Sequence, residues 1–185
     1  MPKKAPKVIG GIGIAAFALV AVVLLANVVL AWRPVSKALS EDSRNSGYVL
    51  RAHLGGYVNP STLVLDLREV KLAAPVDLLR GVFQSAGALH SAGRRFDRVV
   101  LERQGTPVFL MKGQDFADIG AQQTSGENPV YMIRKFPSKL YRPDGTAAYG
   151  EWTGGIFGVL KNEMEDVTHA ITEWSGGPSS PAGPQ

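Results

Sequence analysis

Two carboxylates, Asp66 and Glu69, are the side chains best placed for acid–base chemistry, because both lie near the end of a predicted strand. In the stretch TLVLDLREVKL (residues 62–72) the leucines alternate onto one face, which predicts a strand inside a sheet. Catalytic groups often gather at the ends of such strands. Two acids without an identified partner also fit an ordinary salt bridge, and the sequence favours that structural role.

Three histidines could bind a metal or transfer protons. His53 is predicted on or just after a strand, and His90 in the last turn of a helix, where a cation complements the helix dipole. His169 shares a helix surface with Glu165 and Asp166, and that spacing could bind a metal. No second group of His or Cys completes such a site. The sequence therefore favours a solvated helix face and predicts no metal site.

The usual nucleophiles are missing from the sequence. The chain has no cysteine, and no serine lies in a G-x-S-x-G turn. The lack of cysteine also removes the disulfides that could have indicated an oxidising compartment. We therefore expect a non-catalytic protein rather than an enzyme, with no cofactor.

The segment of residues 128–158 is the most unusual part of the sequence, because its aromatic residues alternate with arginines and lysines before a glycine-rich stretch. Such a pattern suits a protein interface, a small-molecule groove or contact with anionic lipid headgroups. A long connection that packs over the sheet, with its rings in the core, is the structural alternative. The candidate interaction residues are Arg134, Lys135, Tyr141, Arg142, Tyr149, Trp152 and Phe157.

The elements that must position these groups form a strand–helix–strand unit and a hairpin. Pro75 opens a helix that runs to Gly93, and residues 96–103 and 108–112 are strands joined by a turn. Such a passage suits a right-handed crossover between parallel strands. The predicted fold class is an N-terminal single transmembrane helix plus one α/β (or α+β) domain with a mixed sheet, a β-α-β crossover and a β-hairpin. A C-terminal amphipathic helix (residues 159–174) closes the domain.

The transmembrane prediction rests on the uncharged run Val8–Trp32, in which Asn27 is the one clearly polar side chain. At 1.5 Å per residue this run would form a helix about 37 Å long, enough to cross roughly 30 Å of hydrocarbon. A cleaved secretory signal is the alternative, but its apolar part is typically only about 7–15 residues long. The membrane-flanking residues are Lys3, Lys4, Lys7, Trp32 and Arg33.

The net charge of +4 comes from the membrane flanks. Six of the 20 basic residues and two of the 16 acidic ones lie in residues 1–46, so the rest of the chain is neutral. A neutral domain argues against nucleic acid as a partner. Basic residues flank the apolar run on both sides, so charge does not decide its orientation. The short basic tail favours a cytoplasmic N-terminus and an exported C-terminal domain.

Composition divides the chain into five regions. We predict a basic N-terminal tail (residues 1–7), a transmembrane anchor (8–32), a polar tether (33–47), an α/β domain (48–174) and a disordered Gly/Ser/Pro tail (175–185). One domain of that size can form its own core without disulfides or metals.

These observations predict a membrane-anchored, non-catalytic binding or scaffolding module of the bacterial envelope type. Its partners would be the bilayer, through residues 8–32, and another membrane or envelope protein, through the aromatic and basic segment 131–157. The alternative is a membrane-tethered enzyme of unknown reaction that uses Asp66 or Glu69 with a basic residue near 134–142. A pocket in which these acids and basic groups meet would favour the enzyme.

Overall fold

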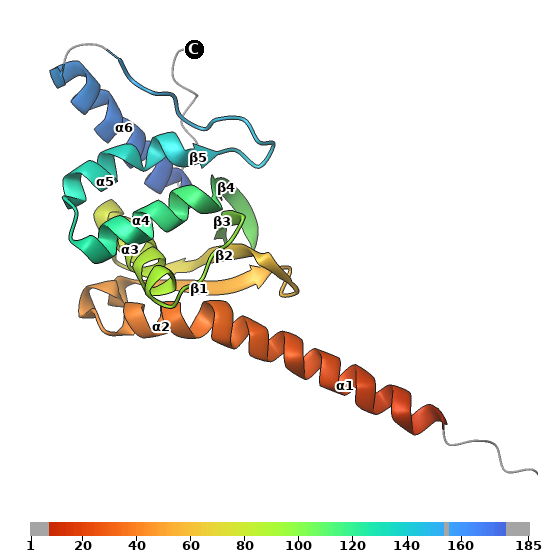
Figure 1. Cartoon of the computed structure of the whole chain (residues 1–185). Helices are drawn as coiled ribbons and strands as arrows, with labels where there is room; N and C mark the ends of the chain where they lie inside the picture. The colour runs from red at the N-terminus through yellow and green to blue at the C-terminus, as the bar shows by residue number, and fades with distance from the viewer. Residues whose placement is uncertain (1–7, 154–155, 177–185) are drawn as a thin grey trace, which may run out of the picture.

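The protein is described here by a computed structural model that covers residues 8–153 and 156–176, and the side chains of residues 8–16, 156 and 157 lie outside the description. Figure 1 shows one long helix projecting from a body of strands and helices. The N-terminal apolar helix and a single domain with a mixed sheet are thus confirmed.

Three helical segments follow one another without a break at the N-terminus. They are α1 (Val8–Asn27), the π-helical segment η1 (Val28–Trp32) and α2 (Arg33–Ser40). Pro34 explains the wider turn of η1, because proline has no N–H for the helix ladder and its ring crowds the preceding carbonyls. The N–H of Arg33 bonds instead to the carbonyl of Val28, five residues back.

The sheet has five strands in the order of the chain. β1 and β2 are antiparallel, β2 and β3 are parallel with helix α3 between them in the chain, and β3, β4 and β5 are antiparallel neighbours. The strands are β1 (Tyr48–Gly55), β2 (Asn59–Val70), β3 (Arg98–Arg103), β4 (Thr106–Lys112) and β5 (Leu140–Tyr141).

The remaining helices pack on one face of this sheet and at its end. The leucines of β2 and Phe109 of β4 form one buried core with apolar residues of the helices. Gly120 of α4 lies so close to α3 that an added Cβ would come within 2.5 Å of the Ala86 carbonyl oxygen. These helices are α3 (Pro75–Ser91), α4 (Gly113–Ser125), α5 (Pro129–Lys135) and α6 (Ile156–Trp174), with short 3₁₀ turns η2 (Ser43–Gly47) and η3 (Pro137–Lys139).

The helical segments that follow α1, η1 and α2, are part of the domain and do not form a separate tether. Ala31 and Val35 are fully buried in the core, and α2 packs against α3 and the edge strand β1. The predicted polar tether, residues 33–47, is therefore helical through Ser40. Its turn-like composition is overridden by the burial of Val35, an effect that local sequence does not reveal.

Asn27, the polar residue of the apolar run, fastens this helix to the domain. It is 7 % exposed, and its side-chain oxygen accepts a 2.9 Å hydrogen bond from the N–H of Leu54 in β1. Its side-chain nitrogen donates to the carbonyls of Val23 and Tyr57, the latter in the β1–β2 turn. Because β1 is an edge strand, its outward N–H groups need such a partner.

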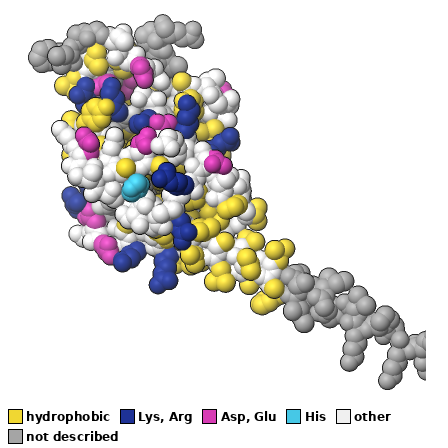
Figure 2. Space-filling model, in the orientation of Figure 1, with side chains coloured by type: hydrophobic (Ala, Val, Ile, Leu, Met, Phe, Trp, Pro, Cys, Tyr) yellow, Lys and Arg dark blue, Asp and Glu magenta, His cyan; other side chains and the backbone are white. Residues whose placement is uncertain are grey.

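The described side chains of α1 before Asn27 are mostly exposed. The large apolar residues Phe17, Leu19, Val20, Val22, Leu24 and Leu25 are all more than half exposed, with Phe17 at 78 % and Leu25 at 61 %. Figure 2 shows these hydrophobic side chains along the projecting helix, whereas charges of both signs are mixed over the body. By length and composition, the described chain has one helix that could cross a membrane.

Candidate functional site

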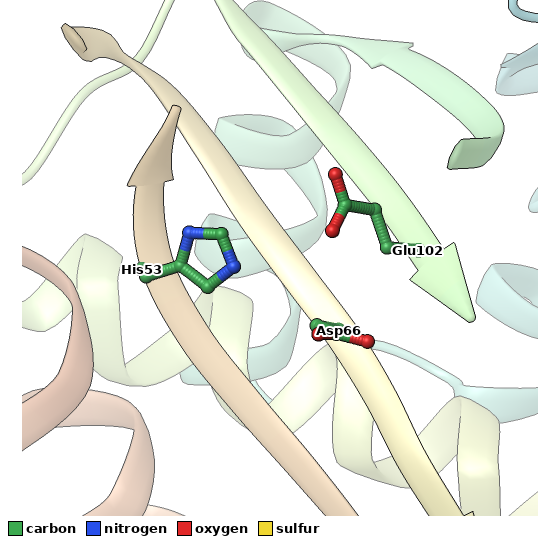
Figure 3. Close-up of side chains that lie close together, drawn as sticks. All are labelled: His53, Asp66 and Glu102. Atoms are coloured by element: carbon green, nitrogen blue, oxygen red, sulfur yellow. The ribbon is translucent and has the colours of Figure 1, made fainter. Parts of the chain in front are cut away.

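The candidate site lies on the face of the sheet opposite the core. His53 of β1, Asp66 of β2 and Glu102 of β3 each offer a ligand atom, and these atoms all lie within 4.8 Å of one another. Figure 3 shows the three side chains gathered over neighbouring strands, with a ring nitrogen of His53 turned toward the carboxyl groups. We call these three residues the open-face cluster.

Strand pairing brings the cluster together. Asp66 pairs with Glu102 across the parallel β2–β3 ladder, and β1 lies on the other side of β2. Side chains alternate along each strand, so a residue between two core leucines points to the other face. Asp66 is in this position between Leu65 and Leu67, which are fully buried in the core.

The imidazole of His53 is held in place by two contacts. Its Nδ1 lies 2.9 Å from the carbonyl oxygen of Leu54, and its ring stacks on Tyr57 with centroids 4.3 Å apart. A carbonyl can only accept, so Nδ1 must carry the proton in this bond. The other nitrogen, Nε2, then keeps a free lone pair in the neutral ring.

The turn that carries Tyr57 has an uncommon backbone. Gly56 and Tyr57 have φ angles of 52° and 64°, and the N–H of Val58 bonds to the carbonyl of Gly55, as in a type I′ turn. Tyrosine rarely adopts this left-handed conformation, which costs about 1–3 kcal/mol. The surrounding contacts retain it, because the Tyr57 ring stacks on His53 and its carbonyl accepts from Asn27.

The two carboxylates of the cluster differ in their neighbours. Asp66, 3 % exposed, has Arg68 Nη1 at 3.1 Å and accepts a 3.2 Å hydrogen bond from the N–H of Gly105. Glu102 is half-buried, and among the described residues no lysine or arginine forms an ion pair with it. Burial raises the pKa of Glu102, the charge of Asp66 adds to this rise, and His53 and Arg68 oppose it.

Of the two predicted catalytic acids, one lies in the cluster and the other does not. Asp66 belongs to the open-face cluster, whereas Glu69 is exposed with Lys71 at 3.6 Å. On α6, His169 is exposed, and its predicted neighbour Asp166 accepts a 2.6 Å hydrogen bond from the indole of Trp152. Sequence reasoning missed the cluster itself, because its members are distant in the chain.

The basic residues of the aromatic segment are engaged within the domain. Glu163 of α6, with a side chain 7 % exposed, binds Arg134 at 2.6 Å and Lys135 at 2.8 Å. Arg142 pairs with Glu173 of the same helix. We call these three contacts the α6 ion-pair group.

Three of the candidate aromatic residues of the segment, Tyr141, Tyr149 and Trp152, are partly buried. The guanidinium of Arg142 lies over the rings of Phe109 and Tyr149, at 5.2 and 6.0 Å from their centroids. Tyr141 lines a hollow of about 290 Å³ at the β4–β5 end of the sheet, with Lys112 over its ring at 5.2 Å. The side chain of Phe157 lies outside the described residues.

The membrane-flanking residues are described in part. Trp32 and Arg33 are exposed at the junction of η1 and α2, and Lys3, Lys4 and Lys7 lie outside the described residues. No protein family, curated protein or solved structure matches the chain.

Proposed function

We propose that the protein is a single-pass, membrane-anchored binding module whose domain is held rigidly at the bilayer surface. One observation carries the proposal: a helix with exposed apolar side chains continues, without a break, into a helix buried in the domain core. In water an apolar surface of this kind is unfavourable, whereas in lipid it is not. The 20 residues of α1 would span about 30 Å, the thickness of the hydrocarbon layer.

The contacts of Asn27 support a boundary of the membrane span near this residue. Asn27 and Ala31 are both buried against the domain, so the lipid-embedded part would end just before them rather than at Trp32. The same burial supports a retained anchor over a cleaved signal, because cleavage near Ala31 would remove both residues from the folded domain. The tip of the β1–β2 turn would then lie at the lipid headgroups.

The membrane test combines intact mass with extraction. We expect the mass of the native protein to include residues 8–32 and the protein to stay in the membrane pellet at alkaline pH. Phe17→Arg with Leu19→Arg should release it, because each central arginine costs about 2.5–3.5 kcal/mol of insertion. Phe17→Ala with Leu19→Ala is the matched control and should stay in the pellet. A shortened native mass, or release of the wild type, would refute the proposal.

The side of the membrane is the second part of the proposal, with the N-terminus in the cytoplasm and the domain exported. The absence of cysteine makes this testable without background. Lys161→Cys creates a thiol at an exposed position of α6. A membrane-impermeant maleimide should label it in intact cells, and labelling only after lysis would place the domain in the cytoplasm.

The partner of the module would be another membrane or envelope protein, bound through residues 131–157. The ion pairs of Arg134, Lys135 and Arg142 mean that replacing these residues would disturb the fold as well as an interface. Tyr131 is a sharper probe, because it is exposed in the same segment. A photo-crosslinker at Tyr131 should capture one defined protein in native membranes, and a crosslinker at exposed Gln123 should not. Equal products from both positions would argue against this surface.

The alternative of a membrane-tethered enzyme has less support. Its predicted catalytic acids and bases have other partners, since Arg134 and Arg142 bind Glu163 and Glu173 of α6. Asp66 has Arg68 and the open-face cluster as neighbours instead. The described contacts therefore favour a binding function over this pairing of acid and base.

A further inference from the structure

We propose that His53, Asp66 and Glu102 form a binding site for one divalent transition-metal ion, of which Zn²⁺ is the natural probe. This site goes beyond the proposed membrane-anchored function and stands on different observations. Three adjacent strands each contribute one residue, and the three ligand atoms lie within 4.8 Å of one another. Strands of one sheet form a rigid frame, so little backbone movement is needed to complete the site.

The orientation of His53 is that of a metal ligand. Histidines that bind metals commonly donate their second ring N–H to a carbonyl or carboxylate, which fixes the tautomer and the ring. His53 has this arrangement, with Nδ1 at 2.9 Å from the Leu54 carbonyl and the ring stacked on Tyr57. Its Nε2 is thereby left as the ligand atom on the side of the two carboxylates, as Figure 3 shows.

The charges of the cluster also favour a cation. Asp66 and Glu102 are paired across neighbouring strands, an arrangement of like charges that destabilises a sheet. Arg68 forms an ion pair with Asp66, and Arg51 is the partner of Asp66 in β1, whereas among the described residues no lysine or arginine forms an ion pair with Glu102. A divalent ion bound by both carboxylates would offset this repulsion.

The ligand set selects the class of metal. One imidazole nitrogen with two carboxylate oxygens suits Zn²⁺ and neighbouring first-row ions, whereas Ca²⁺ and Mg²⁺ prefer oxygen ligands alone. Bonds of about 2.0–2.2 Å would hold the three atoms well inside the 4.8 Å within which they lie. The half-buried Glu102 side chain can make this adjustment by rotation. Three protein ligands would leave a further coordination position for water or a ligand.

An imidazolium is the competing explanation for the cluster. A protonated His53 could balance the carboxylates without any metal, and the cluster would then be an ordinary buried ion-pair group. This explanation predicts no saturable binding of metal at neutral pH. The experiment below therefore measures metal binding itself rather than stability.

The test uses the full chain in detergent micelles after treatment with a chelator. Isothermal titration with ZnCl₂ should give one equivalent with micromolar or tighter affinity, and Co²⁺ should give the visible absorption of a low-coordinate site. His53→Ala and Glu102→Gln should each weaken Zn²⁺ binding at least tenfold. Asp66→Asn should weaken Zn²⁺ binding as well. Its folding must be checked first, because Asp66 also accepts a hydrogen bond from the N–H of Gly105.

The control variants address the other histidines. His90→Gln with His169→Gln should leave the affinity unchanged, because both residues are exposed and outside the cluster. Wild-type protein that binds no zinc would overturn the proposal. An unchanged zinc affinity in Glu102→Gln would also overturn it. The same holds for a loss of zinc affinity in the variant with His90→Gln and His169→Gln. Membrane extraction is a separate measurement, so failure of the metal site would leave the anchor proposal intact.

Discussion

The α6 ion-pair group and the open-face cluster arrange charge in opposite ways. In the first, a buried carboxylate meets two cations, since Glu163 binds Arg134 and Lys135. In the second, two carboxylates are cross-strand partners, and of these two only Asp66 forms an ion pair with an arginine, Arg68. Breaking a buried ion pair destabilises a fold, whereas facing carboxylates repel each other and a bound cation would offset that repulsion. The comparison separates a structural region from a candidate binding site.

The two regions also differ in what holds them. The ion pairs join α5 and the following loop to α6, so they fix the C-terminal part of the domain. The open-face cluster is connected to the N-terminal apolar helix instead, because Tyr57 stacks on His53 and its carbonyl accepts a hydrogen bond from Asn27. One turn therefore links this helix to the cluster.

The largest effect is expected in the ion-pair group. Glu163→Gln should destabilise the domain by about 2–3 kcal/mol, because it leaves two partly buried cations without their counter-ion. Denaturation of the full chain in micelles at pH 7 measures the change. Glu165→Gln is the matched control, since it lies in the same helix in an exposed pair with Lys161. This pair should contribute no more than about 0.5 kcal/mol.

The same variant carries a prediction for pH. Burial acts to raise the pKa of Glu163, but the hydrogen bonds and charges of Lys135 and Arg134 prevail and lower it. A lowered carboxyl pKa stabilises the folded state above the ordinary value of about 4.3 and loses this contribution as the pH falls through the folded-state pKa. The difference between wild type and Glu163→Gln should therefore shrink below about pH 4. A constant difference would contradict the assigned pairing.

The second largest effect concerns the junction between the N-terminal apolar helix and the domain. Asn27→Ala should cost about 1–3 kcal/mol, because the N–H of Leu54 and the carbonyl of Tyr57 lose a buried partner. Val29→Ala, at an exposed position of the same helix, should change the stability far less. Equal effects of the two substitutions in the denaturation of micelle-bound protein would argue against a rigid junction.

The third prediction has the opposite sign. In the presence of a chelator, Glu102→Gln should stabilise the domain by about 0.2–1 kcal/mol, because it removes one of two facing negative charges. Glu69→Gln is the control on the neighbouring strand, where the exposed carboxylate has Lys71 as its partner. The comparison between the two regions fails if Glu102→Gln destabilises the metal-free protein as Glu163→Gln does.

The smallest effect on stability is expected at Tyr57. Tyr57→Asn should change the free energy of unfolding by less than about 1 kcal/mol, because asparagine tolerates the left-handed backbone and so offsets the lost stacking. Zinc affinity should nevertheless fall several-fold, because His53 is no longer held by the ring. Titration calorimetry on the same sample measures this, and an unchanged affinity would remove Tyr57 from the site.

Sequence predicted the elements with strong local patterns. The alternating leucines of β2, Pro75 at the start of α3 and the turn between β3 and β4 appear where the patterns indicate. The helix α4 was missed, since its two glycines and few apolar residues give a weak pattern, and the core at Phe116 and Ile119 stabilises it. Tertiary packing decides such segments.

The candidate site was harder to predict than the fold. Sequence singled out Asp66 near the end of its predicted strand, on the face opposite the leucines, yet it gave no reason to place His53 or Glu102 beside it. That join depends on the order and register of three strands, which are long-range properties. One signal in the sequence could have indicated the cluster, namely a polar residue beside core residues on each of three successive strands. The ion pairs of Arg134 and Arg142 were likewise hidden, because their partners lie about thirty residues later.

Depth in the membrane tests the central claim that α1 holds the domain rigidly at the bilayer surface. Val58 is 68 % exposed at the tip of the β1–β2 turn, next to the turn's bond with Asn27. A spin label on Val58→Cys in lipid nanodiscs should be relaxed by oxygen from the lipid phase more than a label on Lys161→Cys. Equal, fully aqueous accessibility of the two labels would contradict the claim.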